Sequence, residues 1–139
     1  MKKAFSFILV AASLLLASGA QAQGIHVRVD VPFDFTIDKT SYAAGNYDIQ
    51  ALNTSSQALV LSSDKQRRAL VLPHACAKMQ GAEDTVLVFH RVGDEYFLYQ
   101  IWVAGSDMGR EFTAPKREAR LARNGEKSQE IIVAANLVK

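Results

Sequence analysis

The amino-acid sequence predicts a mainly β fold, a small antiparallel sandwich or barrel of about seven to eight strands with one short helix near the C-terminus. Three observations support this. Apolar and polar residues alternate over residues 25–37, two apolar runs at 85–92 and 95–103 flank a Gly-Asp pair, and only residues 113–124 have a helical pattern. A parallel α/β sheet would need several crossover helices, so it is disfavoured.

The first strand segment carries its apolar side chains on odd-numbered positions from Ile25 to Ile37. Pro32 lacks an N–H group, which predicts either an edge strand or two strands joined at a bend. On the polar face, Asp30, Asp34 and Asp38 are spaced four residues apart, or about 13 Å along a strand, too far to share one metal ion. We expect these aspartates to solubilise an exposed face.

The central part of the chain alternates turns with short apolar runs. Ala44-Gly45-Asn46 predicts a turn before a strand at 47–52, and the runs at 58–61 and 69–72 predict a hairpin with a loop of about five residues. Residues 73–84 are small or polar, which indicates a loop, with a helical turn at 75–79 as the alternative.

The strongest hairpin signal is Gly93-Asp94, which suits a two-residue turn. That turn predicts cross-strand pairs His90–Phe97, Phe89–Leu98, Val88–Tyr99 and Leu87–Gln100. Both faces of the hairpin are largely apolar, so we expect it to be central and covered on both sides.

The helix predicted at 113–124 would cover one face of this hairpin. Thr113 is its expected N-cap, Pro115 lies in the first turn, and Asn124-Gly125 is a stop signal. A last buried strand is expected at 130–135.

The N-terminus has the pattern of a secretory signal peptide. Lys2 and Lys3 precede an apolar run that ends in Ala20-Gln21-Ala22, which predicts cleavage after Ala22. The apolar run is shorter than the ~20 residues of a membrane-spanning helix, so an uncleaved anchor is the weaker alternative. We therefore expect a single domain at 23–139, periplasmic or extracellular, with no transmembrane segment after cleavage.

Charge is balanced in the expected mature chain, where 14 Lys and Arg remain once Lys2 and Lys3 are removed, against 14 Asp and Glu. This balance and the export signal argue against nucleic-acid binding. Residues 110–127 are locally basic, with six Lys or Arg against three Glu. Arg117, Arg120 and Arg123 are candidate contacts for an anionic envelope polymer or lipid headgroup, and a solvated face with local ion pairs is the alternative.

Residues suited to catalysis or metal binding are few and scattered. Cys76 is the only cysteine, so no disulfide can form within the chain, and a buried thiol is favoured over an intermolecular bridge or a nucleophile. His74 and Cys76 lack the further ligands that a zinc site needs, and neither a nucleophile-elbow motif nor a phosphate-binding glycine motif is present. We expect no catalytic residues, no metal and no cofactor.

One surface of the predicted central hairpin has binding potential. Arg91, Tyr96, Gln100 and Trp102 would share this surface, where aromatic rings beside polar groups suit a sugar or a small apolar or aromatic molecule. Aromatic side chains packed inside the fold with satisfied polar ends are the alternative interpretation.

Three stretches of the sequence also resemble those of a known protein family. VPFDF at 31–35, AGNYDI at 44–49 and FHRVGDEYFLYQIW at 89–102, followed by GRE at 109–111, resemble a functionally unassigned family of small exported bacterial β-proteins. The resemblance covers roughly residues 27–123, including PKREARLAR after the hairpin. It implies an exported β domain and no activity, ligand or site residue.

Together these observations predict an exported, non-catalytic β domain with a structural or interaction role in the envelope. An exported β protein that binds a small lipid, sugar or aromatic metabolite is the alternative. An exposed first strand would also offer a route to a homodimer through edge-strand pairing.

Overall fold

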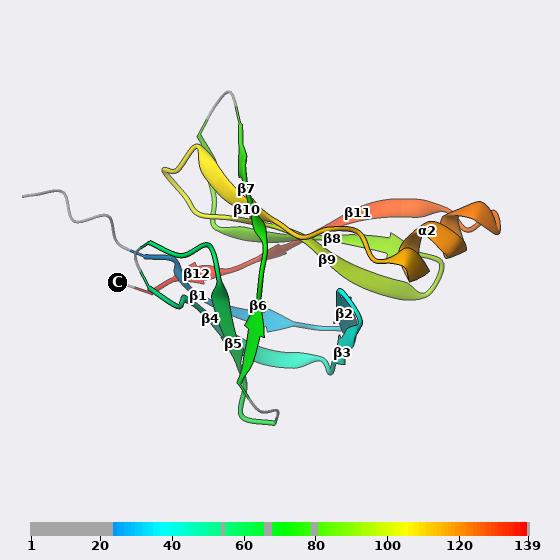
Figure 1. Ribbon diagram of the computed structural model, residues 1–139, viewed down its shortest axis with the longest axis horizontal. Coiled ribbons are helices and arrows are strands. Elements are labelled where there is room, and N and C mark those ends of the chain that lie inside the picture. The colour runs from blue at the N-terminus through cyan, green and yellow to red at the C-terminus, as the bar shows by residue number, and fades with distance from the viewer. Residues whose placement is uncertain (1–23, 54, 66–67, 79–80, 139) are drawn as a thin grey trace, which may run out of the picture.

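A computed structural model describes residues 24–53, 55–65, 68–78 and 81–138. The expected signal peptide lies outside the described residues. The described chain forms two β-sheets packed face to face, with a single short helix, so the predicted mainly β, sandwich-like domain is confirmed (Figure 1).

The first sheet, sheet A, has the strand order β12-β1-β4-β5-β6, and each neighbouring pair is antiparallel. Its strands are β1 (His26–Val31), β4 (Gly45–Ala51), β5 (Leu59–Ser62), β6 (Ala69–Val71) and β12 (Asn136–Leu137).

The second sheet, sheet B, has the order β11-β8-β9-β10-β7, and β2 joins it by pairing with both β3 and β9. Its strands are β2 (Phe35–Ile37), β3 (Thr40–Tyr42), β7 (His74–Ala77), β8 (Val86–Val92), β9 (Glu95–Trp102), β10 (Met108–Glu111) and β11 (Ser128–Ala134).

The alternating segment 25–37 is divided by a bend that begins at Pro32, so β1 belongs to sheet A and β2 to sheet B. This confirms the bend alternative. The edge-strand alternative is wrong, because β1 lies between β4 and β12 in its sheet. Pairing between chains through β1 is therefore blocked where β12 covers it, at Val27 and Arg28.

Aromatic rings fill the space between the sheets. Phe33 packs edge-on against Phe89 at 5.0 Å, and Phe35 contacts the same ring at 5.5 Å. Tyr42 and Tyr47 lie against Phe35 at 5.4 and 5.2 Å. Such pairs contribute about 0.5–1.5 kcal/mol each beyond burial of their area, and the contact of Phe35 in sheet B with Tyr47 of β4 in sheet A helps to hold the two sheets together.

The central hairpin β8–β9 has the predicted two-residue turn, with Val92 paired to Glu95. The predicted register holds near the turn, where Phe89 pairs with Leu98 and His90 with Phe97. Beyond it the register is wrong by one residue, because an irregularity places Val88 opposite Gln100 and Leu87 opposite Ile101. Tyr99 is the additional residue of this β-bulge, which alternation alone cannot reveal.

The number of strands exceeds the predicted seven or eight, since the described residues contain twelve. The hairpin predicted at 58–72 is present as β5 and β6, but β7 lies where a loop was predicted, and β3, β10 and β12 were not predicted. These strands have two to four residues each, too few for a clear alternation.

The helix α2 (Lys116–Arg123) differs from the prediction at its start and in its packing. Its N-cap is Pro115 instead of Thr113, and no side chain caps it. None of its residues is buried, so the prediction that it covers a face of the hairpin is wrong. The physical reason is its composition, because KREARLAR offers only two alanines and one leucine for apolar contact.

We predict that Gly109→Ala destabilises the fold by about 1–3 kcal/mol. A Cβ atom at Gly109 would lie 2.8 Å from the Trp102 ring and 2.9 Å from the Ile101 carbonyl oxygen, so β10 would have to move. Urea unfolding followed by circular dichroism measures the change.

Gly81→Ala is the matched control, since its Cβ would meet no atom closer than 3.8 Å. We expect this control to unfold within about 1 kcal/mol of the parent protein. Equal stability of the two variants would contradict the close packing of Gly109 under Trp102.

Candidate functional site

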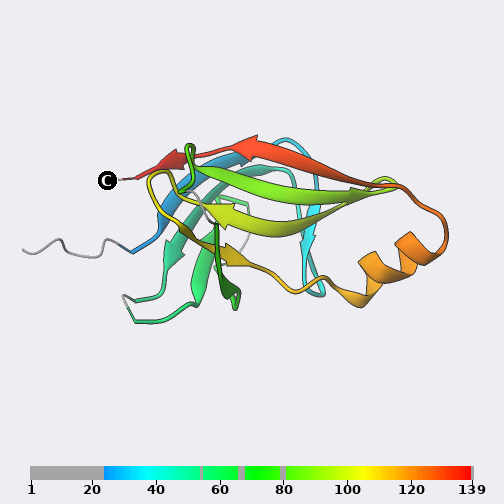
Figure 2. The ribbon, with the colours of Figure 1, turned by 90° about the horizontal axis from the view of Figure 1, so that it is seen from above.

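The helix α2 projects from the end of the sandwich where β8 and β9 turn, as Figure 2 shows. Two polar contacts of its side chains tether it. Arg117 donates from Nε to both Glu95 carboxylate oxygens at 2.7 and 3.0 Å, and the His90 Nδ1 donates to Glu118 Oε1 at 2.7 Å. The Glu95 carboxylate raises the pKa of the Arg117 guanidinium. The helix is thus held to the sheet by polar contacts instead of an apolar face.

The side of α2 opposite Glu118 carries a row of cations that we call the basic stripe, formed by Lys116, Arg120 and Arg123. Their i, i+4, i+7 spacing places them within about 60° of one another around the helix and over about 10 Å of its length. All three are exposed. Within the described part of the chain, the recorded salt bridges include none of them.

Only two of the three residues predicted to contact an anionic partner belong to the basic stripe. Arg120 and Arg123 belong to the basic stripe, whereas Arg117 lies at its margin, about 60° from Arg120 around the helix, and pairs with Glu95. Lys116 was not singled out from the sequence, although its spacing of four from Arg120 was a signal that could have identified it.

The predicted ligand surface on the central hairpin is also divided, because the β-bulge at Tyr99 reverses the faces of the residues that follow it. Arg91 and Tyr96 face the interior side, where the Tyr96 ring stacks on Phe33 at 3.8 Å. Gln100 and Trp102 lie on the opposite, outer face of sheet B, beside Val88 and Val86. The four side chains therefore do not form one surface.

Trp102 is only 1% exposed, and its polar end is engaged. Its Nε1 donates to Gln100 Oε1 at 2.9 Å, and Gln100 Nε2 donates to Glu111 Oε2 at 2.8 Å. The Lys78 ammonium lies over the indole ring, 4.1 Å from its centre. The ring is thus covered by the protein's own side chains, which leaves little of it for a ligand to stack on.

The strand register brings Cys76, His74 and Glu111 onto the outer face of sheet B, since Gly109 pairs with Cys76 and Glu111 with His74. Burial, followed by the Glu111 carboxylate, raises the pKa of the Cys76 thiol. The thiolate is the nucleophilic form of cysteine, so this environment disfavours it as a nucleophile. His74 contacts the Thr113 hydroxyl at 3.2 Å.

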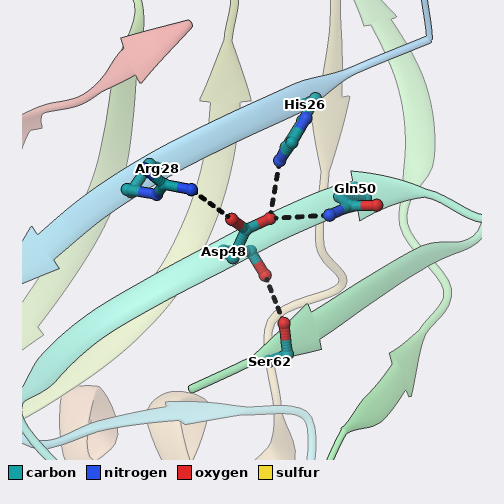
Figure 3. Close-up of polar contacts among 5 residues, drawn as sticks. All are labelled: His26, Arg28, Asp48, Gln50 and Ser62. Carbon is teal, nitrogen blue, oxygen red and sulfur yellow. Dashed lines mark hydrogen bonds and ion pairs between the residues drawn. The ribbon is translucent and has the colours of Figure 1, made fainter. Parts of the chain in front are cut away.

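A polar cluster that the sequence analysis did not predict lies on the outer face of sheet A, and we call it the Asp48 cluster (Figure 3). The Asp48 carboxylate accepts hydrogen bonds from His26 at 2.8 Å, Gln50 at 2.9 Å and Arg28 at 3.2 Å. The Ser62 hydroxyl donates to the Asp48 carbonyl oxygen at 3.4 Å. The cluster depends on β1–β4 pairing, which sets Arg28 opposite Asp48 and His26 opposite Gln50.

The Asp48 carboxylate is held in its ionised form. Burial by itself would raise its pKa, but the hydrogen bonds from Gln50, Arg28 and His26 together outweigh burial, and the pKa lies below the ordinary 3.8. Both carboxylate oxygens are already occupied by these donors. The arrangement stabilises the pairing of β1 with β4 and leaves no free base for catalysis at this position.

Among the described residues, no group of three or more His, Cys, Asp or Glu side chains is placed to hold a metal ion. In the same part of the chain, no helix has the length and apolarity needed to cross a bilayer.

Comparison of the chain with protein-family models, with curated proteins and with solved structures finds no match.

We predict that Asp48→Asn destabilises the fold by about 1 kcal/mol at pH 7, because it removes a carboxylate that three donors stabilise. The folded-state pKa of Asp48 is lowered, so the ionised carboxylate contributes its full share to the free energy of unfolding above about pH 4–5. The contribution decreases as the pH falls through 3.8 toward the folded-state pKa. Urea unfolding of both proteins between pH 7 and pH 2 should show the difference shrink in that window.

Asp30→Asn is the control, since Asp30 is an exposed carboxylate on the same strand face with no recorded hydrogen bond or ion pair. We expect a change within about 0.5 kcal/mol at every pH. A difference between Asp48→Asn and the parent that stays constant down to pH 2 would contradict the role of the ionised carboxylate.

Proposed function

We propose that this protein is an exported, non-catalytic interaction domain of the cell envelope that binds an anionic envelope component through the basic stripe of α2. The observation that carries the proposal is the arrangement of α2. Its Arg117 and Glu118 are used to hold the helix on the sheet, while the exposed Lys116, Arg120 and Arg123 form no salt bridge among the described residues. A row of exposed cations without acidic partners produces a local positive potential that attracts anionic groups.

The N-terminal sequence supports the exported part of the proposal. Lys2 and Lys3, the apolar run and Ala20-Gln21-Ala22 have the order that a secretory signal peptide requires. Phosphate and carboxylate groups are abundant on envelope polymers and lipid headgroups, and guanidinium groups bind both in a bidentate manner.

The states of the reactive side chains support a non-catalytic role. A nucleophilic cysteine requires a lowered pKa, whereas that of Cys76 is raised. His26 and His90 are each hydrogen-bonded to a carboxylate. The small-molecule alternative has less support, because Trp102 is covered and the four residues expected to form its site lie on two faces.

The proposal predicts that the mature protein binds vesicles containing phosphatidylglycerol, or the polyanion dextran sulfate, and does not bind neutral phosphatidylcholine vesicles. A triple variant with Lys116→Gln, Arg120→Gln and Arg123→Gln should bind about 100-fold more weakly, since each cation near an anionic surface contributes about 1 kcal/mol. Sedimentation of vesicles and fluorescence anisotropy measure the two affinities. Binding should weaken as salt rises, because the exposed charges are screened.

A triple variant with Lys39→Gln, Lys65→Gln and Arg68→Gln is the matched control, because it removes the same net charge from exposed positions outside α2. We expect it to keep most of the affinity. The proposal is wrong if both triple variants lose binding equally, or if the parent protein binds neither anionic probe.

A further inference from the structure

Two strand edges without partners lie on either side of a groove between the sheets. Among the described residues, β6 pairs only with β5, and β3 pairs only with β2. The β2–β3 hairpin and β6 carry these labels in Figure 1. The groove has a volume of about 360 Å³ and is lined by Ile37, Asp38, Thr40, Tyr42, Leu70, Val71, Leu72, Phe112 and Thr113.

The lining of this groove includes part of the hydrophobic core. Ile37, Tyr42, Val71 and Phe112 all belong to the core cluster and are at most 7% exposed. They come from both sheets or from the segment that follows β10. At this place the sandwich is not closed by a strand, and an apolar side chain from outside can contact the core directly.

The β6 side of the groove carries two large apolar side chains in solvent. Leu70 is 58% exposed and Leu72 is 73% exposed, while Val71 between them is buried. Cross-strand pairing sets Leu70 beside the half-buried Val60 of β5. Exposed leucines beside an unpaired strand edge are a feature that monomeric proteins avoid unless the edge receives a partner.

The β2–β3 side of the groove carries a negative charge. Asp38 lies in the turn that joins β2 to β3, with a φ of 54°, a conformation that aspartate tolerates better than most residues. Its carboxylate has no recorded hydrogen bond or ion pair within the described chain. A ligand that enters the groove therefore meets the Asp38 carboxylate and two threonines, Thr40 and Thr113, as well as apolar side chains.

We propose that this groove binds an extended segment of a partner polypeptide, which adds as a strand to the free edge of β6. Backbone groups of the segment would pair with those of β6, and alternate apolar side chains would enter the groove between Leu72 and the core. A lysine or arginine at one end of the segment would pair with Asp38. This site lies on different elements from the basic stripe, so it does not depend on the function proposed for α2.

Polypeptide is the ligand class that this geometry favours. A strand edge supplies alternating N–H donors and C=O acceptors, which only another extended backbone matches along its length. The lining combines buried apolar side chains with Asp38, Thr40 and Thr113, and a strand presents different side chains on alternate positions, so it can meet both kinds. A small molecule would leave the β6 edge without partners.

The test uses the mature protein and an acetylated, amidated hexapeptide with the sequence Lys-Val-Thr-Val-Thr-Val, with binding followed by NMR titration. We expect chemical shift changes concentrated in β6 and the β2–β3 hairpin. An analogue N-methylated at alternate residues, which lacks the donors for strand pairing, should lose binding at least about tenfold.

Leu72→Asp should weaken binding of the hexapeptide by about tenfold or more, because it removes an apolar contact without disturbing a buried residue. Ile132→Asp is the matched control, since Ile132 is 61% exposed on β11, outside the groove. We expect the control variant to bind as the parent does.

Asp38→Asn tests the charged end while keeping a residue that tolerates the turn. It should weaken binding of the lysine peptide about two- to fivefold and leave unchanged a peptide with threonine in place of lysine. The proposal is overturned if the N-methylated analogue or the Leu72→Asp variant binds with full affinity. It is also overturned if sedimentation shows a dimer of the free protein that Leu72→Asp dissociates, because the occupant of the edge would then be a second copy of the chain.

Discussion

The structure depends on a single constraint, the packing of one alternating segment against both sheets at once. Residues 25–37 present an unbroken series of apolar side chains on odd positions, and the bend that begins at Pro32 sends β1 into sheet A and β2 into sheet B. Phe33 and Phe35 then reach the same ring, Phe89, at the centre of sheet B. Because the two sheets share this segment, neither can form its buried face without the other.

This packing determines where the polar side chains lie. The space between the sheets is filled by aromatic and aliphatic side chains, so the polar groups are left to the outer faces and the ends of strands. There they form local pairs, such as His26 with Asp48 and His90 with Glu118. Groups used in this way stabilise strand pairing and the position of the helix.

The two proposed binding surfaces differ in what their elements lack, because α2 has few apolar side chains and β6 has an edge without a partner strand among the described residues. The helix α2 lacks the apolar side chains needed to pack, so it stays at the end of the sandwich and keeps Lys116, Arg120 and Arg123 in solvent. On the side away from β5, the edge of β6 has no partner strand among the described residues, and Leu70 and Leu72 stay exposed. On the two proposals, charge would make the first surface selective for anions, whereas backbone pairing would make the second selective for an extended chain.

The sequence by itself determined the β class, the buried face of residues 25–37 and the two-residue turn between β8 and β9, because these follow from local alternation and turn chemistry. It indicated the basic character of α2 but not which cations point outward. The bulge at Tyr99, the Asp48 cluster and the short strands β3, β7 and β10 were decided only by tertiary structure. Each of these depends on a partner strand distant in the sequence, whose register no local pattern specifies.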